Sequence, residues 1–194
     1  MNSDVKSDNF KSDDIKSEKD RLRKRYRLER HDGFLPVEFT NLEEVAEIKA
    51  AQVIASYLSY GDEPVTKLLN QSLIAAGKKL LLPRISGSEL EWVQWNGDEN
   101  QIDKKKRIPE PVGEPFTDLA TIDLILVPAL RMDSEGYRLG QGGGYYDRFL
   151  PKVNAWKIGL LHDGELSSQK LPREPHDVPL DAAATPDLVI RFKV

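Results

Sequence analysis

Short apolar runs recur along the chain and alternate with segments of helical periodicity. Runs of apolar and β-branched residues bounded by turn residues are typical of buried strands. The runs that fit this description are 51–60, 78–83, 121–128, 155–161 and 188–192. Residues 65–76, between the first two, have the spacing of an amphipathic helix. This alternation favours an α/β fold with three layers, α/β/α, and a mostly parallel sheet.

Two further segments are less regular. Residues 42–50 predict a short helix with Asn41 as its N-cap. Residues 90–95 (LEWVQW) alternate apolar and polar positions, which indicates a strand with one exposed face. Trp92 and Trp95 would point to opposite faces of this strand. Only one of them is therefore expected to pack in the core.

The N-terminal part of the chain is the most polar. Residues 1–14 predict a disordered or loosely held tail, followed by a single α/β domain over 15–194. Residues 15–30 predict a helix in which eight Lys or Arg residues accompany three acids. A solvated helix is the simplest interpretation. RNA binding is disfavoured because no set of aromatic side chains accompanies the charges to stack on bases.

The overall composition fits a protein of a reducing compartment without establishing one. The 194 residues carry a formal net charge of −4 and no cysteine, which excludes a disulfide scaffold and a thiolate metal site. No apolar run approaches the ~18 residues of a membrane span, and no apolar segment typical of a secretory signal is present at the N-terminus. We expect a cytoplasmic protein whose main partner is neither a membrane nor nucleic acid.

The strongest local signal is a glycine-rich stretch at residues 136–150. Five of the chain's 13 glycines fall within nine residues there: Gly136, Gly140, Gly142, Gly143 and Gly144. The predicted strand 121–128 precedes the stretch, and a helix can begin at Tyr145. Glycine lets the backbone approach an anion closely, and the unpaired N–H groups of a helix start face such a ligand. The stretch therefore predicts a phosphate site.

The residues around these glycines extend the prediction. Arg138 adds a positive charge at the mouth of the loop, and Asp147 offers an oxygen ligand to a Mg²⁺ that bridges phosphates. The dinucleotide fingerprint G-x-G-x-x-G is absent because Tyr145 stands where its third glycine belongs, and no Walker-type Gly-Lys-Ser/Thr follows. A mobile turn is the alternative on spacing alone, although a turn has no need of the charged and aromatic neighbours.

Residues 138–150 (RLGQGGGYYDRFL) resemble the signature of the 5-formyltetrahydrofolate cyclo-ligase family, also called methenyltetrahydrofolate synthetase. That signature follows a Val-Pro-x-x-x-x-Asp segment, here Val127, Pro128 and Asp133. The resemblance covers about residues 19–185. It implies a three-layer fold similar to that of ribose-5-phosphate isomerase and coenzyme A transferases.

The resemblance also implies a reaction. It is the cyclisation of 5-formyltetrahydrofolate to 5,10-methenyltetrahydrofolate, dependent on ATP and Mg²⁺, with ADP and phosphate released after phosphorylation of the formyl oxygen. The expected partners are ATP and the folate, with or without additional glutamyl residues, and the protein is expected to be a monomer. The alternative is a non-catalytic module of the same fold that binds ATP or folate.

Residue by residue, the resemblance implies an ATP site, a substrate site and catalytic residues. The residues implied for ATP are Lys19, Arg23, Arg138, Leu139, Gly140, Gln141, Gly142, Gly143, Gly144, Tyr145 and Tyr146. Those implied for the substrate are Leu58, Glu63, Tyr145 and Tyr146, and those implied for catalysis are Arg138, Tyr145 and Tyr146. Lys19 and Arg23, four residues apart, share one face of the predicted helix. Glu63 corresponds to an acid that binds the pterin, against which Leu58 would pack.

The resemblance places Mg²⁺ between Asp147 and Asp181, the latter closing an Asp-x-x-x-Asp motif. Two other matches leave alternatives open. Arg84 follows the family's proline and would contact phosphate or a folate carboxylate, but a surface ion pair is equally compatible. Glu110 lies in a matching Ile-x-Glu-Pro motif and could meet the substrate.

Two remaining patterns favour structural roles. The basic run 104–107 is most simply a solvated loop. The pairs His162–Asp163 and His176–Asp177 suggest metal ligands, but no fixed helical spacing relates them, so a zinc site is disfavoured. A capped turn is the simpler interpretation of the second pair.

Overall fold

The computed structural model describes residues 12–39 and 42–192 and is centred on a seven-stranded sheet. Its strands are β1 (Val53–Ala55), β2 (Lys79–Ser86), β3 (Glu89–Trp95), β6 (Leu124–Pro128), β9 (Trp156–Leu160), β11 (Ala182–Ala184) and β12 (Val189–Arg191). They lie in the order β12-β11-β9-β6-β1-β2-β3. The five inner strands are parallel, and the two edge strands are antiparallel to their neighbours. The predicted α/β fold with a mostly parallel sheet is confirmed.

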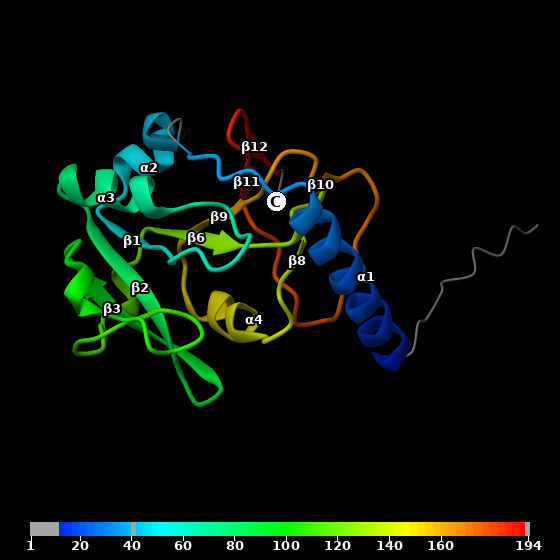
Figure 1. The fold of residues 1–194 in the computed structure, drawn as a ribbon, viewed down its shortest axis with the longest axis horizontal. Helices are drawn as coiled ribbons and strands as arrows, with labels where there is room; N and C mark the ends of the chain where they lie inside the picture. The colour runs from blue at the N-terminus through cyan, green and yellow to red at the C-terminus, as the bar shows by residue number, and fades with distance from the viewer. Residues whose placement is uncertain (1–11, 40–41, 193–194) are drawn as a thin grey trace, which may run out of the picture.

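Helices cover both faces of this sheet (Figure 1). The α-helices are α1 (Ser12–Asp32), α2 (Ala46–Ala50), α3 (Lys67–Ala75) and α4 (Tyr145–Phe149). α2 and α3 lie on one face, and α4 lies on the other. Each face carries its own apolar cluster: Ile54 belongs to the cluster on the α2 and α3 side, and Val53 and Ala55 belong to the cluster on the α4 side. Successive residues of a strand thus supply both layers of core.

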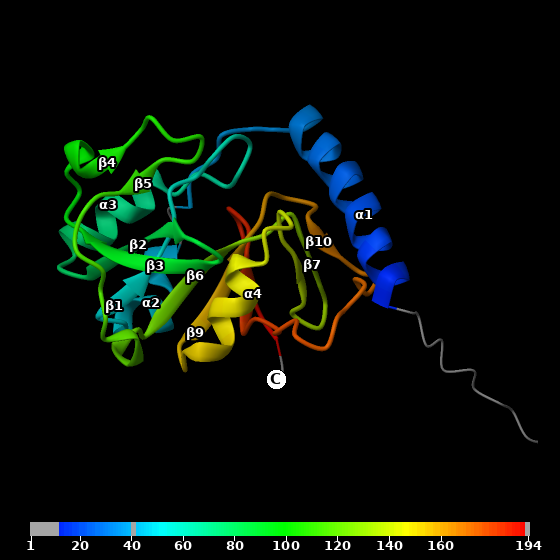
Figure 2. The same cartoon turned by 90° about the horizontal axis from the view of Figure 1, so that it is seen from below.

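α1 stands beside the main sheet (Figure 2) and packs on a smaller one. That sheet has the order β10-β7-β8 and is formed by β7 (Arg131–Asp133), β8 (Arg138–Leu139) and β10 (Leu166–Ser167). Leu22 and Tyr26 of α1 form a buried cluster with Leu139 and Leu171. The side chain of Arg30 is buried near the end of α1 and forms an ion pair with Glu165. These contacts fix α1 against β8 and the loop that follows it.

Some element boundaries differ from the predicted ones. α1 begins at Ser12, so residues 12–14 are helical, while residues 1–11 of the predicted tail lie outside the described residues. The helix predicted over 42–50 is divided into a 3₁₀ turn (Leu42–Glu44) and α2. Its predicted cap, Asn41, also lies outside the described residues. No helix within the described ranges is long and apolar enough to cross a bilayer.

The strand predicted over 51–60 pairs with its neighbours only at Val53–Ala55. The Ser56 N–H still donates to the Leu81 carbonyl of β2, but the next carbonyl, that of Tyr57, accepts from side chains: from the Thr66 hydroxyl at 2.7 Å and from the Asn70 amide at 2.9 Å. Thr66 and Asn70 are themselves buried. The segment after β1 is therefore held in place at the carboxyl edge of the sheet, although it is not a strand.

The prediction that only one of the two tryptophans of β3 packs in the core is wrong. Trp92 is 1% exposed and Trp95 is 3% exposed. Trp92 packs against Phe149 of α4, with ring centroids 4.9 Å apart, and Trp95 belongs to the cluster on the opposite face. The alternating pattern correctly predicted that the two side chains point to opposite faces of the strand. It could not indicate that both faces of this edge strand are covered.

Candidate active site

The glycine-rich loop, residues 140–144, connects β8 to α4 and is largely exposed from Gln141 to Gly143. Gly142 has a φ of 101° and Gly144 has a φ of 68°, which are backbone conformations that favour glycine. A Cβ atom on Gly143 would lie 2.8 Å from the ring of Tyr145. The glycines thus allow a sharp turn with the Tyr145 ring packed across it, and they leave the backbone accessible to a ligand.

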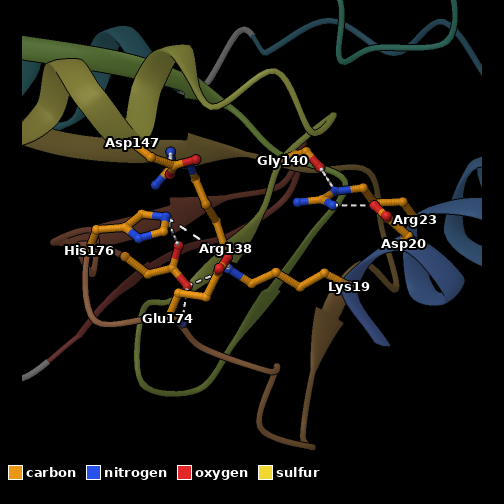
Figure 3. Close-up of polar contacts among 9 residues, drawn as sticks. Lys19, Asp20, Arg23, Arg138, Gly140, Asp147, Glu174 and His176 are labelled. Atoms are coloured by element: carbon orange, nitrogen blue, oxygen red, sulfur yellow. Dashed lines mark hydrogen bonds and ion pairs between the residues drawn. The ribbon is translucent and has the colours of Figure 1, made fainter. Parts of the chain in front are cut away.

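α1 brings two arginines to this loop. The Arg23 Nε donates to the carbonyl of Gly140 at 3.1 Å (Figure 3), and Arg27 donates to the carbonyl of Gln141 at 2.6 Å and to its side chain at 3.0 Å. The structure therefore joins the predicted cation Arg23 to the predicted loop. Arg27 was missed by the sequence analysis, although its spacing of four residues from Arg23 places it on the same helix face.

Lys19, the first of the predicted cations, is only 4% exposed and contacts two acids. Its ammonium group lies 2.8 Å from the Glu174 carboxylate and 2.6 Å from that of Asp177. His176 Nε2 lies 3.9 Å from both carboxylates. One ligand atom from each of Glu174, His176 and Asp177 lies within 4.8 Å of the others. This group, which we call the 174–177 acidic group, can supply hard oxygen ligands to a cation.

Arg138 and Asp147 form an ion pair beside the loop. The Arg138 side chain is 4% exposed, and its guanidinium donates to the Asp147 carboxylate at 2.5 Å. The Arg138 Nε is buried and has no hydrogen-bond partner in the described part of the chain. In Figure 3 this pair and the side chains of Glu174 and His176 point into the same region. Asp147 and the 174–177 acidic group are therefore separate candidates for binding a cation.

The structure does not place Asp181 opposite Asp147. Asp181 precedes β11, at the amino edge of the sheet, where its carboxylate accepts from the Lys157 N–H at 2.7 Å and its own N–H donates to the Lys157 carbonyl. The glycine-rich loop lies at the carboxyl edge, because Leu139, directly before it, accepts from the N–H of Leu130, which follows the carboxyl end of β6. Asp181 therefore caps the start of β9, a structural role that does not support its expected pairing with Asp147.

Glu63 follows the carboxyl end of β1, and the Tyr146 side chain is close enough to respond to its charge. The Glu63 carboxylate accepts from the Tyr60 N–H at 3.1 Å. Burial raises the pKa of Glu63 above its ordinary value, and the Tyr60 N–H, Arg30 and Gln141 oppose this rise only in part. Burial, together with the charge of Glu63, also raises the pKa of Tyr146. The Tyr146 hydroxyl is buried without a hydrogen-bond partner among the described residues, so it is available to a polar ligand atom.

The remaining predicted residues divide between the site and its support. Leu58 is partly buried and packs against the core beside this region. The side chain of Leu139 is fully buried in the cluster beneath α1, so only its backbone can face a ligand. Arg84 forms an ion pair with Glu91, its cross-strand partner, which favours the structural interpretation of that arginine. Glu110 is 5% exposed and accepts from a backbone N–H of β2.

Comparison with known proteins gives a consistent result. The model of the 5-formyltetrahydrofolate cyclo-ligase family matches residues 13–186. The chain is 33% identical over 147 residues to the 5-formyltetrahydrofolate cyclo-ligase of Escherichia coli K12, covering 72% of this chain and 80% of that protein. It is 33% identical over 146 residues to the enzyme of the same name from Mycolicibacterium smegmatis, covering 71% and 75%. The solved structure of Aquifex aeolicus 5,10-methenyltetrahydrofolate synthetase matches with a TM-score of 0.76 and 29% identity, covering 91% and 93% of the two chains.

Proposed function

Because the chain belongs to the 5-formyltetrahydrofolate cyclo-ligase family, we propose that it converts 5-formyltetrahydrofolate to 5,10-methenyltetrahydrofolate at the expense of ATP, with Mg²⁺ bound. Its relatives make it an enzyme of this class.

One observation carries this proposal: a glycine-rich loop lies between two sources of positive charge and a group of carboxylates. Arg23 and Arg27 of α1 contact the loop from one side, and Arg138 lies at its start. Bare backbone flanked by arginines suits a polyphosphate, because guanidinium groups form charge-assisted hydrogen bonds with phosphate oxygens. The loop would hold the phosphates of ATP.

The carboxylates fit Mg²⁺. Asp147, Glu174 and Asp177 offer oxygen ligands, which Mg²⁺ prefers, and no thiolate competes with them. These three residues would hold the ion, which when bound neutralises charge on the phosphates of ATP. Lys19 already contacts Glu174 and Asp177, which supports a position for its ammonium group between the carboxylates and the phosphates of bound ATP. Lys19 would contact the transferred phosphoryl group once the ion takes over the acids.

The folate would lie against the segment after β1. Glu63, as a carboxylate, can accept two hydrogen bonds from the amino and ring N–H donors of a pterin. The Tyr146 hydroxyl, buried beside Glu63 without a partner, would donate to the formyl oxygen or a ring atom. Leu58, partly buried against the core, would supply apolar contact to the pterin ring. Tyr145, packed across Gly143, would lie between the folate and the phosphates.

The chemistry follows from the poor leaving ability of the formyl oxygen. That oxygen attacks the γ-phosphorus, the bond to the β-phosphate breaks, and ADP leaves. The neighbouring amine nitrogen of the folate attacks the activated formyl carbon and loses its proton, and phosphate departs with the former formyl oxygen. Positioning and charge neutralisation carry most of such a phosphoryl transfer. No side-chain nucleophile is required.

The direct test follows product formation with purified protein. With 5-formyltetrahydrofolate and Mg-ATP, the absorbance of the methenyl product is expected to rise, with ADP and phosphate released in equal amounts. No product is expected without ATP or with excess chelator. Binding of both ligands without turnover would instead support a non-catalytic module. Turnover without ATP would contradict the proposal.

Glu63 gives a pH prediction. Burial raises the pKa of this carboxyl, and only the ionised form accepts both pterin hydrogen bonds. The KM for 5-formyltetrahydrofolate is therefore expected to rise as the pH falls through the raised pKa, at a higher pH than an exposed glutamate would give. In Glu63→Gln the KM should be roughly 10- to 100-fold higher and independent of pH in that window.

The control for this prediction is Glu43→Gln, which removes an exposed acid from the surface turn Leu42–Glu44. Its pH profile should match that of the unmodified protein. An unchanged KM in Glu63→Gln, or a profile that keeps its acidic limb, would remove Glu63 from the folate site.

A further inference from the structure

The connection between β4 (Ile102–Asp103) and β5 (Glu110–Pro111) carries four successive cations, residues 104–107. Figure 2 shows this connection beside the main sheet, on the side of the segment that follows β1. The Arg107 Nε donates to the Tyr60 hydroxyl at 3.4 Å, and the Tyr60 N–H donates to the Glu63 carboxylate at 3.1 Å. The basic run is thus connected through a single residue, Tyr60, to Glu63, the carboxylate assigned to the pterin.

The four cations are not equivalent. Lys104 forms an ion pair with Glu99 at 2.7 Å, and Lys106 forms one with the buried carboxylate of Glu110. Lys105 and Arg107 are exposed and form no ion pair with any residue in the ranges 12–39 and 42–192. Two positive charges at the edge of the candidate site are therefore free to bind an anion.

Apolar surface lies between these charges and the pterin position. Tyr60 is 39% exposed and Ile108 is 41% exposed. Tyr60 contacts Arg107 through its hydroxyl group, and Ile108 follows Arg107 in the sequence. A folate has the matching order of parts: a pterin, then an aromatic aminobenzoyl ring, then a glutamate with a pair of carboxylates. An exposed phenol ring and an aliphatic side chain suit the middle part, and paired cations suit the last.

We infer that Lys105 and Arg107 bind the glutamyl carboxylates of the folate and make the enzyme selective for pteroylglutamates over pteroates. This inference rests on the proposed function. It assigns a ligand to the basic run, for which the sequence favoured only solvation. The contacts lie at the protein surface, so they strengthen substrate binding modestly and take no part in phosphoryl transfer.

The test compares two substrates with two matched variants. One variant is Lys105→Gln/Arg107→Gln. The control, Lys67→Gln/Lys104→Gln, removes the same charge from exposed lysines that both face Glu99. The substrates are 5-formyltetrahydrofolate and 5-formyltetrahydropteroate, which lacks the glutamate. The unmodified protein and the control should have a KM about tenfold lower for the folate than for the pteroate, the size expected of two exposed charge contacts.

The Lys105→Gln/Arg107→Gln variant is expected to lose this discrimination, with its KM for the folate rising about tenfold towards the value for the pteroate. Added salt should reduce the discrimination of the unmodified protein in the same direction. Equal discrimination in both variants, or an equal rise in KM for both substrates, would overturn the inference while leaving the proposed function intact. Failure of the unmodified protein to cyclise either substrate would instead overturn the proposed function, and the inference with it.

Discussion

Replacing Asp147 by alanine is expected to lower the kcat for cyclisation by about 100- to 1,000-fold, the loss typical of removing one electrostatic contact to a transition state. Two effects act together. The proposed Mg²⁺ site loses one of its carboxylates, and Arg138 loses its ion-pair partner. Initial rates of product formation at saturating ATP and folate measure the loss. Raising the Mg²⁺ concentration should recover part of the rate if ion binding is the main defect.

A loss of folding could imitate this result, because Arg138 is 4% exposed and would be left as an unpaired buried charge. Asp147→Asn separates the two causes: it keeps the side-chain volume and a hydrogen-bond acceptor for Arg138 but removes the negative charge. Its unfolding midpoint in urea should fall less than that of the alanine variant, while its kcat falls as much. Full activity in Asp147→Asn would exclude the carboxylate from the metal site.

Asp181→Asn is the matched control. Asp181 accepts from the Lys157 N–H at the amino edge of the sheet, and an asparagine oxygen can accept the same bond. Its kcat is expected to stay within about twofold of the unmodified value, since surface and capping substitutions of this kind act mainly on stability. A loss as large as that of Asp147→Asn would instead support Asp181 as a metal ligand and contradict the arrangement proposed here.

The contrast between these two acids shows what a sequence can predict. Asp147 lies a few residues from the glycines and from Arg138, so one local motif was enough to predict that these residues lie together. The second set of carboxylates reaches Lys19 across 155 residues of sequence. Which acid of the Asp-x-x-x-Asp motif faces the site depends on the path of the chain between β10 and β11. That path is set by tertiary packing, which local spacing does not reveal.

The fold was predicted more completely than the lengths of its elements. Alternating apolar runs indicated the parallel sheet, because each strand is buried on both faces. The run 51–60 was read as one strand, yet only Val53–Ala55 pair, because Thr66 and Asn70 take over the hydrogen bonds of the Tyr57 carbonyl. A hydrogen bond from a side chain to a buried carbonyl leaves no regular pattern of apolar and polar residues by which the sequence could predict it. The segment it shapes is the one that carries Glu63, so the irregularity lies where the proposed function needs it.

Replacing Arg138 by methionine is expected to lower kcat by about 1,000-fold with little change in KM for the folate, because a guanidinium that neutralises a transferred phosphoryl group acts mainly in the transition state. Arg138→Lys should recover only part of the rate, since an ammonium group cannot contact Asp147 and a phosphate oxygen with the same planar geometry. Single-turnover measurements of ADP and product formation locate the loss in the chemical step.

Arg84→Met is the matched control. Arg84 pairs with Glu91 on β3, so the kcat of this variant should stay near the unmodified value. If ATP affinity falls in Arg138→Met while single-turnover chemistry keeps its rate, Arg138 binds ground-state ATP and the catalytic role is excluded.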